Sequence, residues 1–418
     1  MAHKFIPGIA SQSLGNPQYH SIKPKLQEAA RAGLRSIEIF YEDIAQLASQ
    51  YHNNATILAP EFQPAAQGTT FLRSTEEQEV LLACARQIGQ WCLDASPHRL
   101  EVICLQPFMH FEGLLDGEER NQRFEKLHFW IRIAQQLGTT LIQIPSNFLP
   151  ESDCSGEKAR LVEDLREAAR IGAQQTPAIR FAYEALCWGT HINTWNAAWD
   201  LVKQVDMPNF GTCLDTFNIA GRVYAEPESP SGKTACAEVD MVRLIQKLRD
   251  TFSDAENLKK VFYVELCDGE RLDKPISPSH EWYNAEQPGR MSWSRNARLF
   301  PFETEAAEAL RQGYNPGYLP VAQVLDALLE AGYEGYISFE VFNRSLNQPG
   351  QHVIDAHARR ASESWRRCVE HIEEFMATKF EVNNAMSTDA VSYVQADGQQ
   401  QFSEQVIGEE VLSISSRL

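Results

Sequence analysis

Four acidic residues stand within or at the ends of four successive apolar runs, and together they suit a metal ion. They are Glu184 in FAYEAL, Asp215 in TCLDTF, Glu265 in FYVELC and Glu340 in ISFEVF. An acid inside an apolar strand is costly unless it is paired or binds a cation, and any one of them alone could be a structural acid paired with an arginine. Four converging carboxylates repel one another and need a positive centre, which a divalent ion supplies. The sequence therefore predicts a metal site.

The type of ligand limits which metals could bind and which reactions they could support. The sequence holds no HExxH or HxxEH motif and no cysteine-rich finger, so it lacks the usual patterns of zinc hydrolases. Carboxylate ligands favour Mg²⁺ or Mn²⁺, with Co²⁺ as a further candidate. Such an ion would polarise a carbonyl and hold the adjacent hydroxyl, so that removal of the proton next to the carbonyl gives a stabilised enediolate. We therefore expect a small-molecule substrate.

Two histidines and two arginines are candidates for the remaining chemistry. His191 and His110 each follow an apolar run, and a neutral imidazole there could act as general acid or base. Each could equally be a surface or hydrogen-bonded histidine. Arg295 and Arg298 lie in one long segment, and their guanidinium groups could hold a substrate carboxylate. The alternative is that both are solvated loop residues.

Three further residues near the acids are candidates for binding the substrate. Asn218 follows Asp215 by three residues and could orient the substrate or a water molecule, and Arg222 could pair with acids of the site. Trp188 follows Glu184 by four residues, and it is expected to be part of the pocket wall or of the core.

The elements that must position these residues are short apolar runs alternating with helical segments. The runs are near-continuously apolar, as expected of parallel strands covered on both faces. Eight such units over about 340 residues predict a (β/α)₈ TIM barrel, whose active site lies at the carboxyl ends of its strands. An open doubly wound sheet is the alternative, but no GxGxxG follows the first run. The eight expected strands are 4–11, 34–41, 99–107, 140–147, 179–186, 209–216, 261–268 and 335–342.

The chain beyond these units is expected to form two loops and a tail. The segments 42–76 and 269–319 would lie on the carboxyl-end face as lids or binding loops. We assign 1–377 to the barrel domain. From about residue 378 the sequence is polar and without periodicity, so 378–418 is predicted to be a disordered tail.

Charge and cysteine content exclude several classes of protein. The net charge is −18 and the pI is about 5.1, which disfavours nucleic acid and anionic membranes as partners. Nine cysteines occur without a CxxC pair, as expected of reduced thiols in an intracellular protein. The sequence shows no signal peptide and no apolar stretch of about 18 residues.

Longer strings of sequence resemble a known family. The strings are SIEIFYED (36–43), ICLQPFMHFEG (103–113), IQIPSNFL (142–149), YEALCWGTHINTW (183–195), PNFGTCLDTFNIAGRVYA (208–225), MSWSRNARLFPFE (291–303) and SFEVFNRS (338–345). On these strings the chain resembles the fungal 3-dehydroshikimate dehydratases of quinate catabolism, which belong to the sugar-phosphate isomerase/epimerase superfamily with a xylose isomerase-like TIM barrel. The resemblance spans about residues 5–345.

The resemblance implies an activity and a ligand set. The activity would be the metal-dependent conversion of 3-dehydroshikimate to protocatechuate (3,4-dihydroxybenzoate), in quinate or shikimate catabolism or in secondary metabolism. Glu184, Asp215 and Glu340 match the metal-ligand positions of the family. Glu265 departs from it, because relatives carry an amide or imidazole there, and a fourth carboxylate would bind a cation more tightly and damp its Lewis acidity. Relatives often carry histidine at the position of Asn218.

Two other functions stay open at this point. One is a sugar or keto-polyol isomerase or epimerase on the same barrel, which shares the metal and the proton abstraction but has no leaving group. The other is a metal-binding protein without catalysis, and Glu265 is the feature that favours it.

The last three residues suggest a location in the cell. Ser416, Arg417 and Leu418 resemble the Ser-Lys-Leu terminus that peroxisomal import receptors read, with arginine keeping the positive charge of lysine. We expect a peroxisomal protein that binds this receptor, with a cytoplasmic location as the alternative.

Overall fold

The computed structural model describes residues 4–52, 74–303 and 313–379. Internal contacts divide the chain into a body, Ala2–Cys368, and a second unit of Met1 with Val369–Leu418. Of the second unit the structure describes 369–379, which are helical. Most of the predicted tail, including Ser416, Arg417 and Leu418, lies outside the described residues.

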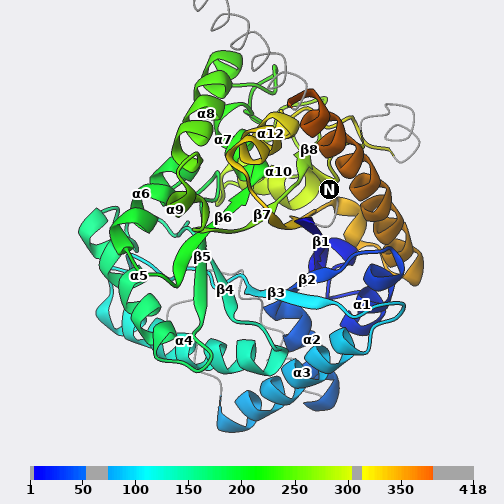
Figure 1. The fold of residues 1–418 in the computed structure, drawn as a ribbon. Helices are drawn as coiled ribbons and strands as arrows, with labels where there is room; N and C mark the ends of the chain where they lie inside the picture. Colours follow the sequence, from blue (N-terminus) through cyan, green and yellow to red (C-terminus); the bar gives the residue numbers. More distant parts are fainter. Residues whose placement is uncertain (1–3, 53–73, 304–312, 380–418) are drawn as a thin grey trace, which may run out of the picture. The chain divides into compact units, whose positions relative to one another are not determined.

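The body is built on a closed barrel of eight parallel strands, in the order β1-β10-β7-β6-β5-β4-β3-β2 (Figure 1). The predicted TIM barrel is therefore confirmed, and the open-sheet alternative is wrong. A short antiparallel pair, β8 (Asp268–Gly269) with β9 (Arg298–Leu299), stands beside it. The barrel strands are β1 (Phe5–Ala10), β2 (Ser36–Phe40), β3 (Glu101–Gln106), β4 (Leu141–Pro145), β5 (Arg180–Glu184), β6 (Phe210–Asp215), β7 (Val261–Glu265) and β10 (Gly335–Phe339).

Helices surround the strands as an outer layer (Figure 1). A further helix covers residues 351–368 of the body. The others are α1 (Ile22–Arg31), α2 (Tyr41–His52), α3 (Thr75–Leu93), α4 (Gly117–Leu137), α5 (Lys158–Ala173), α6 (Trp195–Val205), α7 (Thr216–Val223), α8 (Ala237–Phe252), α9 (Ala255–Leu258), α10 (Gly289–Ala297) and α12 (Val321–Ala331), with 3₁₀ turns η2 (Ser11–Leu14) and η4 (Arg344–Asn347).

Local sequence explains where several helices begin and end. Ser74 and Glu77 form a capping box at the start of α3, with the Glu77 amide donating to the Ser74 hydroxyl at 3.3 Å, which satisfies amides that have no partner inside the helix. Gly138 takes a left-handed conformation with φ of 83° and ends α4. Ser21 directly precedes α1, but its side chain makes no capping hydrogen bond.

The segment predicted as a loop after the second strand is partly helical. Tyr41 was expected to end a strand, but it begins α2, which runs to His52. Residues 53–73 lie outside the described residues. The segment after β7 also contains regular secondary structure, namely β8, α10 and β9.

A layer of small and aromatic side chains fills the barrel interior. Ile103, Cys104, Leu141, Ala182, Cys213 and Tyr263 form one buried cluster. Closely packed side chains in a barrel interior fix the strands relative to one another. The residues at the strand ends are therefore held in defined positions.

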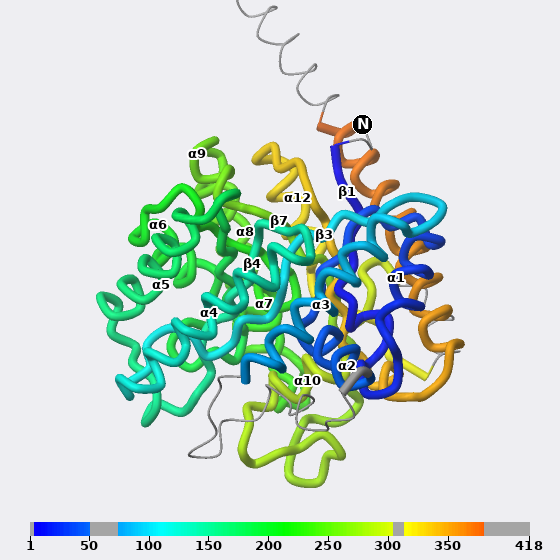
Figure 2. Tube along the Cα trace, turned by 90° about the horizontal axis from the view of Figure 1, so that it is seen from below, coloured from blue at the N-terminus to red at the C-terminus, as the bar shows by residue number. Residues whose placement is uncertain are grey.

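The two ends of the barrel differ. In Figure 2, α10 and the yellow-green segment after β7 extend beyond the strands, at the end opposite to that where β1 begins. This is the carboxyl end of the parallel strands, where barrel active sites lie.

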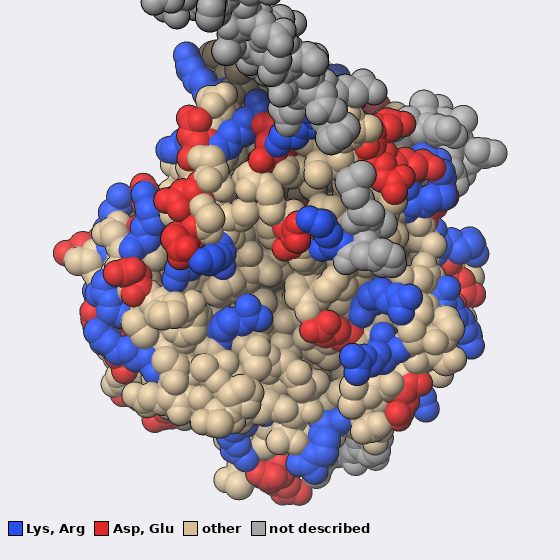
Figure 3. All heavy atoms as spheres, in the orientation of Figure 1, with Lys and Arg blue, Asp and Glu red and all other residues tan. Residues whose placement is uncertain are grey.

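Figure 3 shows a face of the molecule, in the orientation of Figure 1, on which acidic and basic side chains are interspersed around a mostly uncharged centre. No helix in the described part of the chain is long and apolar enough to cross a membrane.

Candidate metal centre and active site

The four predicted acids meet at the carboxyl end of the barrel. Glu184, Asp215 and Glu265 are the last residues of β5, β6 and β7, and Glu340 directly follows β10. The parallel register pairs Asp215 with Glu265. All four side chains are buried, and one carboxylate oxygen from each lies within 4.8 Å of the others. The strand register therefore brings together residues that are up to 156 positions apart in sequence, from Glu184 to Glu340.

Neutral donors orient two of these carboxylates. The Nδ2 of Asn218 donates to the Oε1 of Glu184 and to the Oδ2 of Asp215, both at 2.7 Å. The Nε2 of Gln143, from β4, donates to the other oxygen of Glu184. The carbonyl oxygen of Asn218 accepts from the Cys187 amide at 2.9 Å, so the hydrogen bonds of this side chain fix its own position and that of the two acids.

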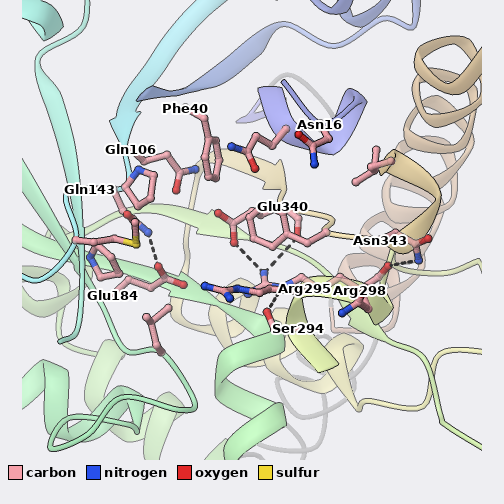
Figure 4. A pocket seen from close by; sticks show the side chains of 18 of the residues that line it. Asn16, Phe40, Gln106, Gln143, Glu184, Ser294, Arg295, Arg298, Glu340 and Asn343 are labelled. Atoms are coloured by element: carbon pink, nitrogen blue, oxygen red, sulfur yellow. Dashed lines mark hydrogen bonds and ion pairs between the residues drawn. The ribbon is translucent and has the colours of Figure 1, made fainter. Parts of the chain in front are cut away.

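One guanidinium group lies among the acids. Arg298, in β9, is 1% exposed, and its Nη1 donates to the Oδ2 of Asp215 at 2.8 Å and to the Oε2 of Glu340 at 2.9 Å. Figure 4 shows Arg298 beside Glu340, with Glu184 and Gln143 across the pocket. Glu265 accepts from the Tyr263 hydroxyl at 3.2 Å through Oε1, but its Oε2 is buried without a hydrogen-bond partner.

Burial and mutual repulsion shift the pKa values of the clustered acids. Burial, followed by repulsion from Glu340, raises the pKa of both Glu184 and Glu265 well above the ordinary value. Burial likewise raises the pKa of Glu340 to about 8. For Arg298 burial disfavours the charged form, but Asp215 and Glu340 outweigh it and raise its pKa. These carboxylates lack positive charge to balance them.

The residues present fit a divalent cation. Four buried carboxylates with oxygen ligands in reach of one point are the donor set of a hard metal ion. No nitrogen or hydroxyl donor bonds the Oε2 of Glu265, and its side chain lies at hydrogen-bond distance from that of Glu38, so a cation or a proton held between the two acids would satisfy this acceptor. A fifth acid, Glu38 in β2, is fully buried close by and accepts from the Nε2 of Gln106 at 2.6 Å.

A pocket of about 410 Å³ opens above the cluster. Glu184, Glu340 and Arg298 line it, together with Arg295 (Figure 4). Apolar and aromatic side chains form part of its wall, and amide side chains form another part, so it suits a small ring that carries hydroxyl groups. The apolar part is Phe40, Pro107, Met109, Pro145, Phe148, Leu186, Trp188, Phe342 and Leu346; the amides are Gln12, Asn16, Gln18, Gln106, Gln143, Asn296, Asn343 and Asn347.

The predicted arginines and the tryptophan occupy different positions. Trp188 lines the pocket, as expected of a wall residue. Arg295 also lines it and donates to Gln287 at 3.1 Å, and burial lowers its pKa. Arg298 lines it too, but it is bound to the site's own carboxylates. Arg222 lies on a separate surface groove with Thr194 and Arg243, and donates to the Cys187 carbonyl at 3.4 Å.

Neither predicted histidine is among the residues that line the pocket. The Nε2 of His191 contacts the Cys154 carbonyl at 3.1 Å. His110 is 5% exposed, lies 3.3 Å from the Asn147 side chain, and packs its ring against Phe148. Burial lowers the pKa of His110 to about 3, so its imidazole is neutral at neutral pH. His110 thus packs behind the wall residue Phe148, and the catalytic roles of both histidines stay predictions.

Sequence reasoning missed Glu38, Gln106 and Gln143, although a signal for them was present. Glu38 lies in SIEIF and Gln143 in LIQIP, each as the one strongly polar side chain of its strand. The cost of burying a polar group, which singled out the other acids, applies to these residues as well.

Comparisons with known proteins show the family. The family model described as a xylose isomerase-like TIM barrel matches residues 26–375. The chain is 44% identical over 366 residues to the 3-dehydroshikimate dehydratase of Neurospora crassa, which covers 87% of this chain and 93% of that protein. The chain therefore belongs to the xylose isomerase-like TIM-barrel family, and within it to the group of the Neurospora enzyme. The resemblance read from the sequence is confirmed.

Two more distant proteins resemble the chain, one in sequence and one in structure. The chain is 30% identical over 258 residues to a 3-dehydroshikimate dehydratase of Pseudomonas aeruginosa, which is 62% of this chain but only 31% of that longer protein. A solved structure described as the IolI protein with a binding zinc atom has a TM-score of 0.56 at 15% identity, covering 88% of this chain and 99% of that one. At 15% sequence identity, this similarity supports a shared fold and nothing more specific.

Proposed function

We propose that this chain is a metal-dependent 3-dehydroshikimate dehydratase, which forms protocatechuate and water. The observation that carries the proposal is the 44% identity to the Neurospora 3-dehydroshikimate dehydratase over nearly the whole of both chains. The carboxylate cluster beneath a pocket of about 410 Å³ supports it, because the pocket is large enough for a six-membered ring with its substituents.

Glu184, Asp215, Glu265 and Glu340 would hold the metal, for which we propose Mg²⁺ or Mn²⁺, with Co²⁺ as a further candidate. When bound, the ion would polarise the substrate ketone and stabilise the negative charge that develops as the neighbouring proton leaves. Asn218 and Gln143 keep Glu184 oriented toward the site. Since such donors hold a ligand in one geometry, they contribute to metal affinity without contacting the ion.

The pocket residues position the substrate and move its proton. We assign the substrate carboxylate to Arg295, because Arg298 is already bound to Asp215 and Glu340. Among the described residues that line the pocket, Glu184 and Glu340 are the groups able to accept a proton. A carboxylate oxygen of Glu184 or Glu340 that is not a ligand of the metal takes the proton from the carbon between the ketone and the leaving hydroxyl. The hydroxyl then leaves as water with the proton that this carboxylic acid returns, and the shift of one proton from the remaining ring CH2 group to the ketone oxygen completes the aromatic ring. The aromatic wall excludes solvent from this step.

The experiment that tests the function follows the aromatic product. Purified protein is incubated with 3-dehydroshikimate and Mg²⁺, Mn²⁺ or Co²⁺, and protocatechuate is measured by its ultraviolet absorbance, with EDTA as the control. We expect a metal-dependent rise that EDTA abolishes. Absence of product from protein with bound metal would contradict the proposal and return attention to isomerisation of cyclic keto-polyols.

We also propose that the peroxisomal import receptor binds Ser416, Arg417 and Leu418. Removal of these three residues should disperse a fluorescent fusion of the chain from puncta into the cytosol and leave its enzymatic activity unchanged, because the signal is read by a receptor and takes no part in the site. Live imaging with a peroxisomal marker makes the measurement. Unchanged puncta would remove the proposal in favour of another location.

A further inference from the structure

The buried acids at the carboxyl end of the barrel are not balanced by the protein alone. Glu38, Glu184, Asp215, Glu265 and Glu340 are each at most 4% exposed. In the described part of the chain, the ion pairs formed with these five acids both come from a single guanidinium group, that of Arg298. Because Arg298 pairs with two of these buried carboxylates, it affects the stability of the site when no metal is bound.

The surroundings of Arg298 fix its guanidinium group in place. Its Nε donates to the Ser294 hydroxyl at 3.0 Å, and its Nη1 also donates to the Glu340 carbonyl at 3.2 Å. The faces of Phe217 and Phe342 lie 4.4 and 5.1 Å from the guanidinium carbon. The backbone is held as well, since β9 pairs with β8. A guanidinium group held by these contacts is a fixed part of the pocket wall. It differs in this from a side chain that moves when a substrate binds.

We propose that Arg298 is a built-in counter-cation, which holds Asp215 and Glu340 in place before the metal binds and which the metal partly replaces. This inference deepens the proposed function and rests on its metal site. Both acids use one oxygen each for Arg298, the Oδ2 of Asp215 and the Oε2 of Glu340. The same oxygens are candidates for the metal, so the two cations stabilise one set of charges.

A thermodynamic consequence separates this role from binding of a substrate carboxylate. Removal of one partner from a buried ion pair leaves an uncompensated charge and is strongly destabilising. A metal that binds the folded state supplies the missing charge, and it stabilises the fold by an amount that grows with the logarithm of its concentration divided by its Kd. Loss of Arg298 should therefore make the fold more dependent on metal. Loss of a residue that contacts only the substrate should not.

Arg295 provides a matched control for the same measurement. It comes from the same segment and lines the same pocket, and it donates to the Gln287 side chain at 3.1 Å. The experiment compares Arg298→Gln, Arg298→Lys and Arg295→Gln with the wild type. Melting temperatures are measured after EDTA treatment and again with saturating Mg²⁺ or Mn²⁺, and bound metal is quantified.

We expect metal-free Arg298→Gln to melt lower than the metal-free wild type, with a metal-induced rise larger than that of the wild type by about 5 °C. Arg298→Lys keeps the charge but loses the bond to Ser294 and the packing on Phe217 and Phe342, so its metal-induced rise should lie between those of the wild type and Arg298→Gln. Arg295→Gln should resemble the wild type. Recovery of Arg298→Gln in folded form only with metal would be the extreme of the expected result.

An equal metal-induced rise in the wild type and in Arg298→Gln would overturn the inference while leaving the metal site intact. So would an Arg298→Gln variant that fails to fold even with saturating metal, because the metal should then stand in for the missing charge. If metal stabilises none of the proteins, including the wild type, the metal dependence in the proposed function fails first, and the two failures are thus distinguished.

Discussion

Glu184→Ala is expected to abolish metal binding and to lower turnover of 3-dehydroshikimate by at least about 10³-fold, since the metal contributes several kcal/mol of transition-state stabilisation. Glu184 lies at the floor of the pocket and is held there by Gln143 and Asn218. Without its carboxylate the site loses both a ligand and the acceptor toward which two buried donors point, and unsatisfied donors are costly. Bound metal and turnover are measured on the same sample.

Glu184 is a cleaner target than Asp215. Asp215 is also the residue that caps α7, because its Oδ1 accepts from the Phe217 amide at 2.7 Å, and loss of such a cap by itself costs about 1 kcal/mol. Glu163→Ala removes an exposed acid that pairs with Arg170 on α5, and it serves as the control for substitution of an acid in general. Full turnover by Glu184→Ala in folded form would rule out the metal centre as described.

The barrel and the acidic cluster followed from the sequence because both depend on short-range rules. Parallel strands that are covered on both faces read as apolar runs, and their carboxyl ends meet at one end of the barrel. An acid at the end of such a run, as in FAYEAL or TCLDTF, must therefore face its counterparts across the barrel. No loop geometry enters this argument, and the structure places Glu184, Asp215, Glu265 and Glu340 together.

The residues that were placed less well owe their positions to local backbone conformation or to contacts between segments far apart in the sequence. His110 follows a strand end closely but has a positive φ of 55° and packs against Phe148, and no pattern in MHFEG indicates this direction. Arg298 was expected to face a substrate carboxylate. Its actual partners, Asp215 and Glu340, lie 83 and 42 residues away, and pairing over such distances is set by tertiary packing.

Glu265→Gln is expected to stabilise the metal-free protein, with a gain that grows with pH. Burial raises the pKa of Glu265 and of Glu340, the latter to about 8. A carboxyl group whose pKa is raised on folding contributes stability that is present below its unfolded value of about 4.5 and is lost as pH rises through the folded value. Metal-free wild-type protein should therefore lose stability between about pH 4.5 and 8.

The amide removes one of the titrating groups and its repulsion of the others. We expect the variant to be more stable than the wild type at pH 8 by at least about 1.4 kcal/mol, the equivalent of one pKa unit, and the two to converge near pH 4.5. Urea unfolding in EDTA at several pH values makes the measurement. Glu112→Gln is the control for metal binding, since Glu112 is also buried, with its pKa raised to about 7 and a pH dependence of the same sign, but bonds to Tyr183 and the Asn147 amide outside the cluster.

Metal binding distinguishes the two variants. Glu265→Gln should bind Mg²⁺ or Mn²⁺ about 10- to 100-fold more weakly, because it lacks one charged ligand, whereas Glu112→Gln should bind as the wild type does. At saturating metal we expect turnover by Glu265→Gln to be retained, since an amide oxygen still completes the ligand set and damps the Lewis acidity of the ion less than a carboxylate. A loss of turnover with metal fully bound would instead assign Glu265 a direct part in the chemistry, and the fourth carboxylate would then be a requirement of this site.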